Sequence, residues 1–331
     1  MDILITGSVA YDYLMSFPGY FKDHILPEHI ENISLSFLVE TMEKRRGGVA
    51  PNIAYTLALF GERPRLLAAV GEDFEEYRQW LEENGIDTRG AKVIPGTFTA
   101  SFFANTDRAN AQIATFYTGA MAYASQLHLT ELDGEKPELV LISPNDPQAM
   151  KQYVDECIAL QIPYLYDPSQ QIVRLTGEEL RHGIDHALAL FVNEYEFALI
   201  QKMTGYSIEE IARRVQFTVV TRGECGAELY AEGQHLHIPA VPPQRVADPT
   251  GVGDAFRGGF LAAYGRGLDW ETCGRVGALA ATYCLEHYGT QTHRYTPAEF
   301  VQRFRQIFDD QGKLEVFLNP GRDPSAGALL R

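Results

Sequence analysis

A short segment in the last third of the chain surrounds two glycines with acidic residues. Residues 248–256 read D-P-T-G-V-G-D-A-F, and an apolar stretch with helical spacing follows. Because the glycines permit a sharp turn, we expect a helix to begin here, with the unpaired N–H groups of its first turn forming an anion site. The expected donors are Gly251, Val252 and Gly253. Asp254, which the helix dipole keeps ionised, could accept a proton from a substrate hydroxyl, although it could also merely stabilise the helix N-terminus.

Two earlier motifs carry groups that suit a ligand with several hydroxyls. The segment R-G-G-V-A-P-N, residues 46–52, places a Gly-Gly pair ahead of an Asn that opens a helix. Gly48 and Asn52 would therefore offer backbone donors and a side-chain amide. Asp12 follows the first apolar run and could accept hydrogen bonds from two adjacent hydroxyls of a sugar. Taken singly, Asn52 could be a helix cap and Asp12 a surface loop residue.

Alternating elements are needed to bring these segments together. Short β-rich runs alternate with stretches of helical periodicity, which is typical of βα units and of a mainly parallel sheet that binds ligands at its strand ends. The strands that the pattern predicts are residues 3–6, 65–70, 139–143, 164–167, 188–192 and 218–221. The predicted helices are residues 52–60, 147–160, 193–203 and 208–215.

Two segments interrupt this alternation. Residues 33–46 and 97–117 are rich in Thr, Phe and alternating side chains, and a turn-like N-T-D-R-A-N divides the second segment. This pattern predicts a small β-sheet inserted into the α/β domain, where it would act as a lid that excludes water from the reaction. An edge hairpin without a gating role fits the pattern equally well.

The composition restricts the class of protein. The chain has 331 residues, of which 45% are hydrophobic and 22% charged, as in a folded enzyme. Its net charge of −16 argues against a nucleic-acid partner, which would need clustered Lys and Arg. No apolar run is long enough for a membrane span. The four cysteines form no C-x-x-C pair and His235 and His237 suggest an exposed hairpin, so we expect neither a disulfide framework nor a metal knuckle, and we expect a cytoplasmic protein.

Taken together, the motifs give a specific resemblance. The Gly-Gly pair with Asn52, Gly61 and Gly71, followed by D-x-T-G-x-G-D, resembles the ribokinase-like (PfkB) family of carbohydrate and nucleoside kinases, from residue 3 to roughly residue 310. Pro249 and Val252 stand where Thr and Ala are commoner. The resemblance implies a three-layer α/β/α sandwich with a small inserted β-sheet lid. The large domain would comprise residues 1–13, 47–96 and 119–331, and the lid residues 14–46 and 97–118.

The same resemblance implies ATP and Mg²⁺ as cofactors. The segment N-E-Y-E resembles the N-x-x-E motif that organises magnesium and phosphate through water, which gives Glu196 an indirect metal role. The segments T-R-G-E-C-G and H-Y-G-T-Q resemble the nucleotide-binding turn and the loop near the adenine of ATP. The ATP-binding residues so implied are Asn193, Thr221, Arg222, Gly223, Gly226, Gly289 and Gln291. A monovalent cation such as K⁺ near Asp248 is also implied, although Pro249 leaves that site open.

Within the family, several segments resemble the bacterial adenosine kinases, among them T-G-S-V-A-Y-D-Y-L, R-G-G-V-A-P-N, D-P-S-Q-Q and D-P-T-G-V-G-D-A-F-R. This implies that the ribose hydroxyls are held by Asp12, Gly48 and Asn52. The residues implied around the purine are Ser8, Ser36, Phe37, Phe102 and Phe116. Gln170, Gln171 and Arg174 would line the path toward the phosphates. Aromatic side chains in a lid agree with a base as ligand, but they could also be the lid's own core, which we favour for Phe103.

We therefore expect an ATP-dependent kinase that phosphorylates adenosine at its 5'-hydroxyl to give AMP, a purine salvage reaction. A kinase of ribose, or of another sugar or nucleoside, would use the same chemistry. A catalytically silent nucleoside-binding protein is the alternative from a different class. The resemblance implies a homodimer. Arg257, one turn beyond Asp254, would either reach phosphate or pair with an acidic neighbour.

Overall fold

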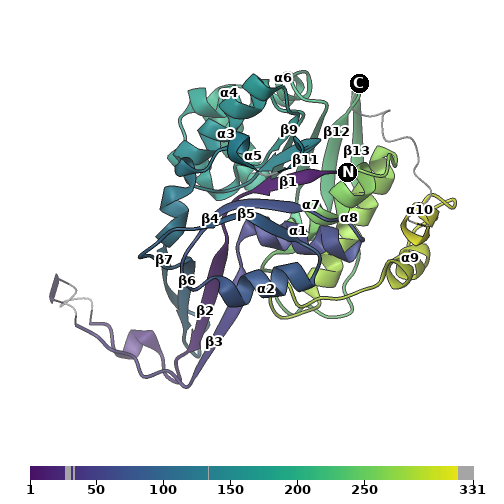
Figure 1. The fold of residues 1–331 in the computed structure, drawn as a ribbon. Coiled ribbons are helices and arrows are strands. Elements are labelled where there is room, and N and C mark those ends of the chain that lie inside the picture. The colour runs from purple at the N-terminus through teal and green to yellow at the C-terminus, as the bar shows by residue number, and fades with distance from the viewer. Residues whose placement is uncertain (27–30, 33, 133, 320–331) are drawn as a thin grey trace.

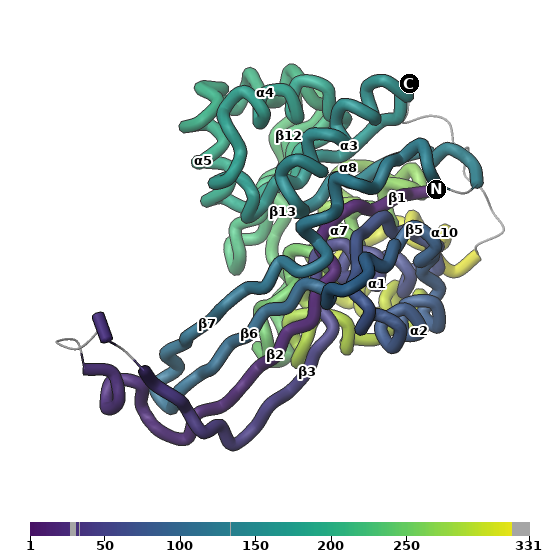
Figure 2. The backbone as a smooth tube through the Cα atoms, turned by 60° about the vertical axis from the view of Figure 1, so that its left-hand side comes forward, coloured from purple at the N-terminus to yellow at the C-terminus, as the bar shows by residue number. Residues whose placement is uncertain are grey.

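The computed structural model describes residues 1–26, 31–32, 34–132 and 134–319. Ile33, the start of one expected lid segment, and the tail after Asn319, which the sequence indicates to be a loose terminus, lie outside these residues. Within the described chain, one large sheet lies between two layers of helices, and a second, smaller sheet projects from one end of this body (Figures 1 and 2). The ribokinase-like three-layer fold with a small second sheet is thereby confirmed.

The large sheet is mainly parallel. Among the described residues it contains nine strands in the order β13-β12-β11-β10-β9-β8-β1-β4-β5, and only the pairings β11–β12 and β12–β13 are antiparallel. Their bounds are β1 Ile3–Thr6, β4 Arg65–Val70, β5 Asp87–Val93, β8 Leu139–Ile142, β9 Tyr164–Tyr166, β10 Ala189–Asn193, β11 Phe217–Thr221, β12 Ala227–Ala231 and β13 Gln234–Ile238.

Helices cover both faces of this sheet, so its central strands are apolar on both sides. In β1, Ile3 and Ile5 belong to one buried cluster, whereas Leu4 belongs to the other, as a strand with alternating side chains requires. The first cluster includes residues of α1 Val49–Leu59, α2 Glu75–Glu83, α7 Val252–Tyr264, α8 Trp270–Leu285, α9 Pro297–Arg305 and α10 Glu315–Leu318. The second includes residues of α3 Pro147–Leu160, α4 Gly177–Asp185, α5 Glu194–Thr204 and α6 Ile208–Ala212.

The small sheet has the order β3-β2-β6-β7 in the described chain, and Figure 2 shows its strands running away from the body. Its strands are β2 Ala10–Ser16, β3 Thr41–Gly47, β6 Ala100–Thr106 and β7 Gln112–Tyr117. The predicted hairpin with its N-T-D-R-A-N turn is confirmed as β6 and β7. Strand β2 was not predicted; it pairs parallel to β6 and places Asp12 within a strand instead of a loop.

Several predicted bounds differ from those observed. Helix α1 begins at Val49, ahead of the predicted Asn52, because Gly48 has φ +94° and a proline in the first helical turn is tolerated. The helix predicted to reach Val215 ends at Ala212. His235 and His237 do lie on an exposed hairpin strand, where both contact Glu228. In the part of the chain that the structure describes, the helices are too short or too polar for one to cross a membrane.

Candidate active site

A cavity of about 1290 Å³ lies between the body and the small sheet. Its inner wall includes residues at or just after the ends of strands of the large sheet, such as Ser8 after β1, Pro144 after β8 and Thr221 at the end of β11. Its outer wall is one face of the small sheet. This is the place where an open α/β sheet is expected to bind ligands.

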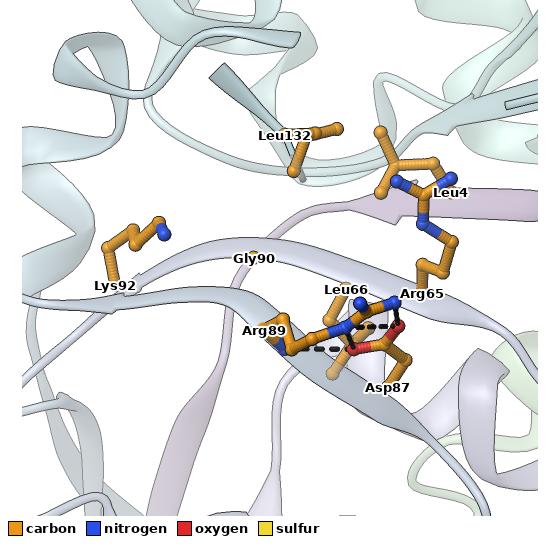
Figure 3. A pocket seen from close by; sticks show the side chains of 8 residues that line it. All are labelled: Leu4, Arg65, Leu66, Asp87, Arg89, Gly90, Lys92 and Leu132. Atoms are coloured by element: carbon orange, nitrogen blue, oxygen red, sulfur yellow. Dashed lines mark hydrogen bonds and ion pairs between the residues drawn. The ribbon is translucent and has the colours of Figure 1, made fainter. Parts of the chain in front are cut away.

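A second hollow offers no comparable site. It measures about 10 Å³ and lies beside β4 and β5, where Arg65, Arg89, Lys92 and Leu132 are among the residues that line it (Figure 3). The Arg89 guanidinium turns back to Asp87, with Nε 3.0 Å from Oδ1. A volume of this size holds about one water molecule, so the hollow is too small to be a substrate-binding site.

The start of α7 has the geometry that the glycine motif predicted. Gly251 is the N-cap and has φ +76°, and a Cβ there would lie 2.7 Å from the Thr290 side chain. Among the described residues, no side chain caps this helix. The N–H groups of its first turn have no intrahelical acceptor, and Gly251, Val252 and Gly253 all line the cavity. The turn can therefore offer amide donors and the positive end of a helix dipole to an anion.

Asp254 lies at the same turn and faces the cavity. Burial raises the pKa of its carboxyl to about 6, although the neighbouring Arg257 and a hydrogen bond from Asn52 lower it. The Asn52 Nδ2 group donates to Asp254 Oδ2 at 2.9 Å. A carboxylate with this pKa is ionised at neutral pH and is basic enough to take a proton from a hydroxyl.

A buried ion pair lies behind the Asp254 carboxylate. Arg257 contacts Asp167 through Nε to Oδ2 at 2.6 Å and through Nη2 to Oδ1 at 2.8 Å. The Asp167 side chain is fully buried and that of Arg257 is 7% exposed. Burial raises the pKa of Asp167, and the guanidinium opposes that rise. Of the two roles considered for Arg257, pairing with an acidic neighbour is the one this geometry displays, while its guanidinium still borders the cavity.

The small sheet presents the predicted sugar and base contacts on one face. Asp12 is in register with Arg45 on β3 and with Phe102 on β6, and Phe102 is in register with Phe116 on β7. All four side chains therefore point to the same side of the sheet, and all line the cavity. Burial raises the pKa of Asp12 to about 6, while Arg45 lowers it.

The opposite end of the cavity holds the N-E-Y-E motif. Asn193 and Glu196 form a capping box at the start of α5, in which Glu196 Oε2 accepts from the Asn193 N–H at 2.8 Å. Glu196 Oε1 accepts from Ser169 Oγ at 3.1 Å. Because both carboxylate oxygens already accept hydrogen bonds, this donor set fits a Mg²⁺ ion held through its water shell better than direct coordination.

Most of the predicted site residues line this cavity together. They are Ser8, Asp12, Gly48, Asn52, Phe102, Phe116, Gln170, Gln171, Arg174, Asn193, Glu196, Thr221, Gly223, Gly226, Gly251, Val252, Gly253, Asp254 and Gly289. The structure thus gathers residues from both sheets and from segments more than 200 positions apart. Their individual roles toward a ligand stay predictions.

Four predicted site residues lie outside the cavity lining. Phe37 packs against Phe17 and Phe21, with ring centroids 5.0 and 4.9 Å away, and Ser36 beside it is exposed, so a contact of either with the purine would need this segment to move. Arg222 is held by two ion pairs with Glu194 and Glu228. Gln291 is buried behind Asn52 and donates to its Oδ1 at 2.9 Å.

Sequence reasoning missed three contributors. Asp167 directly follows β9, and its partner Arg257 is 90 positions away in the sequence. Arg45 lies 203 positions from Asp248, and its Nη1 atom is 3.1 Å from Asp248 Oδ2. Tyr77, in the middle of α2, reaches the site through Gln291. No local pattern marks any of them, because each acts through a contact between distant segments.

Comparisons with known proteins agree with this architecture. The model of the pfkB family of carbohydrate kinases matches residues 9–297. The nucleoside kinase of Burkholderia thailandensis, solved in complex with inosine, is 38% identical with a TM-score of 0.83 and covers 92% of this chain and 98% of its own. The same enzyme with ADP-inosine has a TM-score of 0.80 and is 40% identical, with 92% and 96% covered.

Two further relatives come from archaea. A nucleoside kinase of Methanocaldococcus jannaschii is 30% identical over 311 residues, which is 92% of this chain and 97% of the relative. A cytidine kinase of Thermococcus kodakarensis is 28% identical over 262 residues, 73% of this chain and 88% of the relative. The relatives thus differ in their nucleoside: the Burkholderia enzyme was solved with inosine, and the Thermococcus relative is a cytidine kinase.

Proposed function

The chain belongs to the pfkB family of carbohydrate kinases, and from this premise we propose that it is an ATP-dependent nucleoside kinase that phosphorylates adenosine at the 5'-hydroxyl to give AMP. One observation carries the proposal: a single cavity holds a buried carboxylate at an uncapped helix start and, on its opposite wall, two aromatic side chains. A plain sugar would need the first feature but not the second. A nucleoside needs both.

The geometry supports a direct transfer. Asp254 would accept the proton of the attacking 5'-hydroxyl, and the amides of Gly251, Val252 and Gly253 would stabilise negative charge on the migrating phosphoryl group. Mg²⁺ would neutralise charge on the ATP oxygens, and Glu196 would orient its water shell. Asp12 and Asn52 would fix the ribose, so that the hydroxyl lies in line with the phosphate.

The family resemblance also implies a monovalent cation beside Asp248. Asp248 Oδ2 already lies 3.1 Å from Arg45 Nη1 and accepts from the Gly289 amide at 3.1 Å. Asp248 Oδ1 accepts from the Thr250 amide at 2.9 Å. Since these donors supply much of the positive field that a cation would provide, we propose only a modest stimulation by K⁺.

A substrate panel tests the proposal. ADP release would be measured with ATP and, in turn, adenosine, guanosine, inosine, cytidine and ribose, and the phosphorylated position of each product would be identified. We expect turnover of nucleosides, with adenosine preferred. Inosine is the second candidate, because a relative at 38% identity was solved with it. A preference for ribose would overturn the argument from the aromatic wall, and nucleoside binding without ADP release would indicate a silent binding protein.

We also propose a cytoplasmic homodimer. All six residues of β7, an edge strand of the small sheet, are exposed, and an exposed edge strand is a ready template for pairing with a second chain. The four cysteines are free, as a reducing compartment would keep them. Light scattering coupled to size-exclusion chromatography would give the molar mass; a monomer at micromolar concentration would contradict the dimer.

A further inference from the structure

The Asn52 amide lies between the base and a buried glutamine. On one side Asn52 Nδ2 donates to Asp254 Oδ2 at 2.9 Å, and on the other Gln291 Nε2 donates to Asn52 Oδ1 at 2.9 Å. Asn52 is 5% exposed and Gln291 3% exposed. Asp254 therefore receives this hydrogen bond only when the Asn52 amide is oriented with its NH₂ group toward the carboxylate.

The network behind Asn52 fixes that orientation. Gln291 Nε2 also donates to the Tyr77 hydroxyl at 2.5 Å, and Tyr77 donates to the carbonyl oxygen of Gly47 at 2.9 Å. The indole N–H of Trp80 lies 3.3 Å from Gln291 Oε1. The donor and acceptor roles are fixed at both ends of this network, because the Gly47 carbonyl oxygen can only accept a hydrogen bond and the Trp80 indole N–H can only donate one.

The fixed ends determine every bond between them. Because Tyr77 gives its proton to Gly47, its oxygen must accept from the Gln291 NH₂ group. Because the Gln291 oxygen faces Trp80, the same NH₂ group faces the Asn52 oxygen, and the Asn52 NH₂ group is left to face Asp254. A reversed Asn52 amide would place its oxygen against the Asp254 carboxylate oxygen and its NH₂ group against the NH₂ group of Gln291, so neither hydrogen bond could form.

We propose that Gln291 and Tyr77 are positioning residues for the transfer reaction, which act by holding the Asn52 amide with its NH₂ group toward Asp254. This inference rests on the proposed function, in which Asp254 is the base. It gives Gln291 a role other than the adenine contact that the sequence suggested. Gly47 is the last residue of β3, so the network also ties the base to the root of the small sheet.

Other charged groups act on the same carboxylate and must be kept constant in a test. Arg257 of α7 lowers the pKa of Asp254 and Glu196 of α5 raises it. Asp167, at the end of β9, acts on Asp254 through its pairing with Arg257. The buried thiol of Cys284 on α8 also lies within electrostatic reach, since Asp254 contributes to raising its pKa. None of these groups contacts Gln291 or Tyr77 in the described hydrogen bonds and ion pairs.

The test compares two network variants with a matched control. Gln291→Met keeps the length of the side chain and removes both of its hydrogen-bonding ends, and Tyr77→Phe removes one hydroxyl. The control is Tyr153→Phe, since Tyr153 is also fully buried and its hydroxyl also donates to a backbone carbonyl, that of Ala124, at 2.9 Å on the other face of the large sheet. Thermal unfolding of all three variants would verify that they fold.

We expect Gln291→Met to lower kcat about tenfold and to move the acidic limb of the pH profile up by about one pH unit, because Asp254 loses an oriented donor to its ionised form. The sign follows from the role of the base: the ionised carboxylate is active, so a higher pKa removes activity at a pH where the wild type still works. Tyr77→Phe should give a smaller change in the same direction. Tyr153→Phe should leave the profile unchanged even if it lowers the melting temperature.

A direct titration separates failure of this inference from failure of the proposed function. Carbon-13 NMR of labelled Asp side chains would report the pKa of Asp254 in the ligand-free protein, whatever it phosphorylates. An Asp254 pKa that is the same in wild type and in folded Gln291→Met overturns the inference and leaves the kinase proposal standing. A wild type that phosphorylates no nucleoside, with the pKa shift present, rejects the function and keeps the network. Equal pH profiles for Tyr77→Phe and Tyr153→Phe would likewise show a merely structural role.

Discussion

The two walls of the cavity are built in opposite ways. One wall contains a base cluster, in which Asn52, Asp254 and Arg257 line the cavity and Asp167 lies behind them, and its buried charges are paired or hydrogen-bonded. The other wall is the small sheet, where every residue of β7 is exposed and where Phe116 is 49% exposed. The chemistry would thus be performed by groups locked in the body, while recognition would depend on a surface with few packing constraints.

The difference has an energetic reason. A base and its partners must be held within a fraction of an ångström, and burial in a low dielectric strengthens every interaction among them. An exposed sheet has weaker restraints, so it can close on a ligand and tolerate different bases. Substitutions in the base cluster should therefore reduce kcat or stability, whereas those on the small sheet should change KM.

The largest effect is expected from Asp254→Asn. The substitution preserves the shape of the side chain and removes its ability to accept a proton, so kcat should fall by about 10²- to 10⁴-fold. Nucleoside affinity, measured by calorimetry in the absence of ATP, should change little, because the ribose and base contacts remain. A variant with near-normal kcat would remove Asp254 from the role of base.

A somewhat smaller effect, on stability, is expected from Arg257→Met. Loss of the guanidinium leaves Asp167 buried without its partner, which should lower the free energy of unfolding by about 3–5 kcal/mol in chemical denaturation. The double variant with Asp167→Asn should recover part of this loss, because the buried charge is removed.

The matched control for this ion pair lies on the small sheet. Glu43, 60% exposed, pairs with Arg45 at 2.6 Å, and Glu43→Gln should change the free energy of unfolding by at most about 1 kcal/mol. A loss of similar size in both variants would mean that the two walls do not differ as described.

Different features of the two walls could be predicted from the sequence. The start of α7 could be predicted because its donors and its base lie within nine consecutive residues, 248–256, whose glycines and following apolar run describe a helix start. The partners of Asp167 and Gln291 could not be predicted, because Asp167 pairs with a residue 90 positions away and Gln291 with a residue 239 positions away. A local sequence pattern predicts local geometry, whereas a buried contact between distant segments cannot be predicted from a single sequence.

On the small sheet, the alternation of β6 and β7 was sufficient to predict a hairpin, whereas Phe102 and Phe116 were assigned to the purine by resemblance and the observed register places them on one face. The strand β2 was missed, since its parallel pairing with β6 is a nonlocal contact and its polar Asp12 resembles a loop residue. Phe37 was assigned by resemblance alone; residues 34–40 form no strand, and only the packed structure shows it against Phe17.

The smallest effect, and the most direct test of recognition, is expected from Phe102→Leu. Phe102 lines the cavity, and loss of its aromatic face should raise KM for the nucleoside about 5- to 20-fold, the lower part of the range for stacking on a base, with kcat nearly unchanged. The neighbouring Phe103 provides the control. Its ring points to the opposite face of β6 and stacks on Tyr13 with centroids 4.8 Å apart.

The two adjacent phenylalanines separate recognition from sheet integrity. Phe103→Leu removes the same number of atoms from the same strand, so any general loosening of the sheet should appear in both variants. We expect it to lower the melting temperature while leaving KM at the wild-type value. A rise in KM of equal size in both variants would show that the sheet acts as one body and that its inner face does not select the base. A fall in kcat with Phe102→Leu would show that the small sheet also positions the reacting hydroxyl, because a contact made only in binding cannot change the turnover of the bound complex.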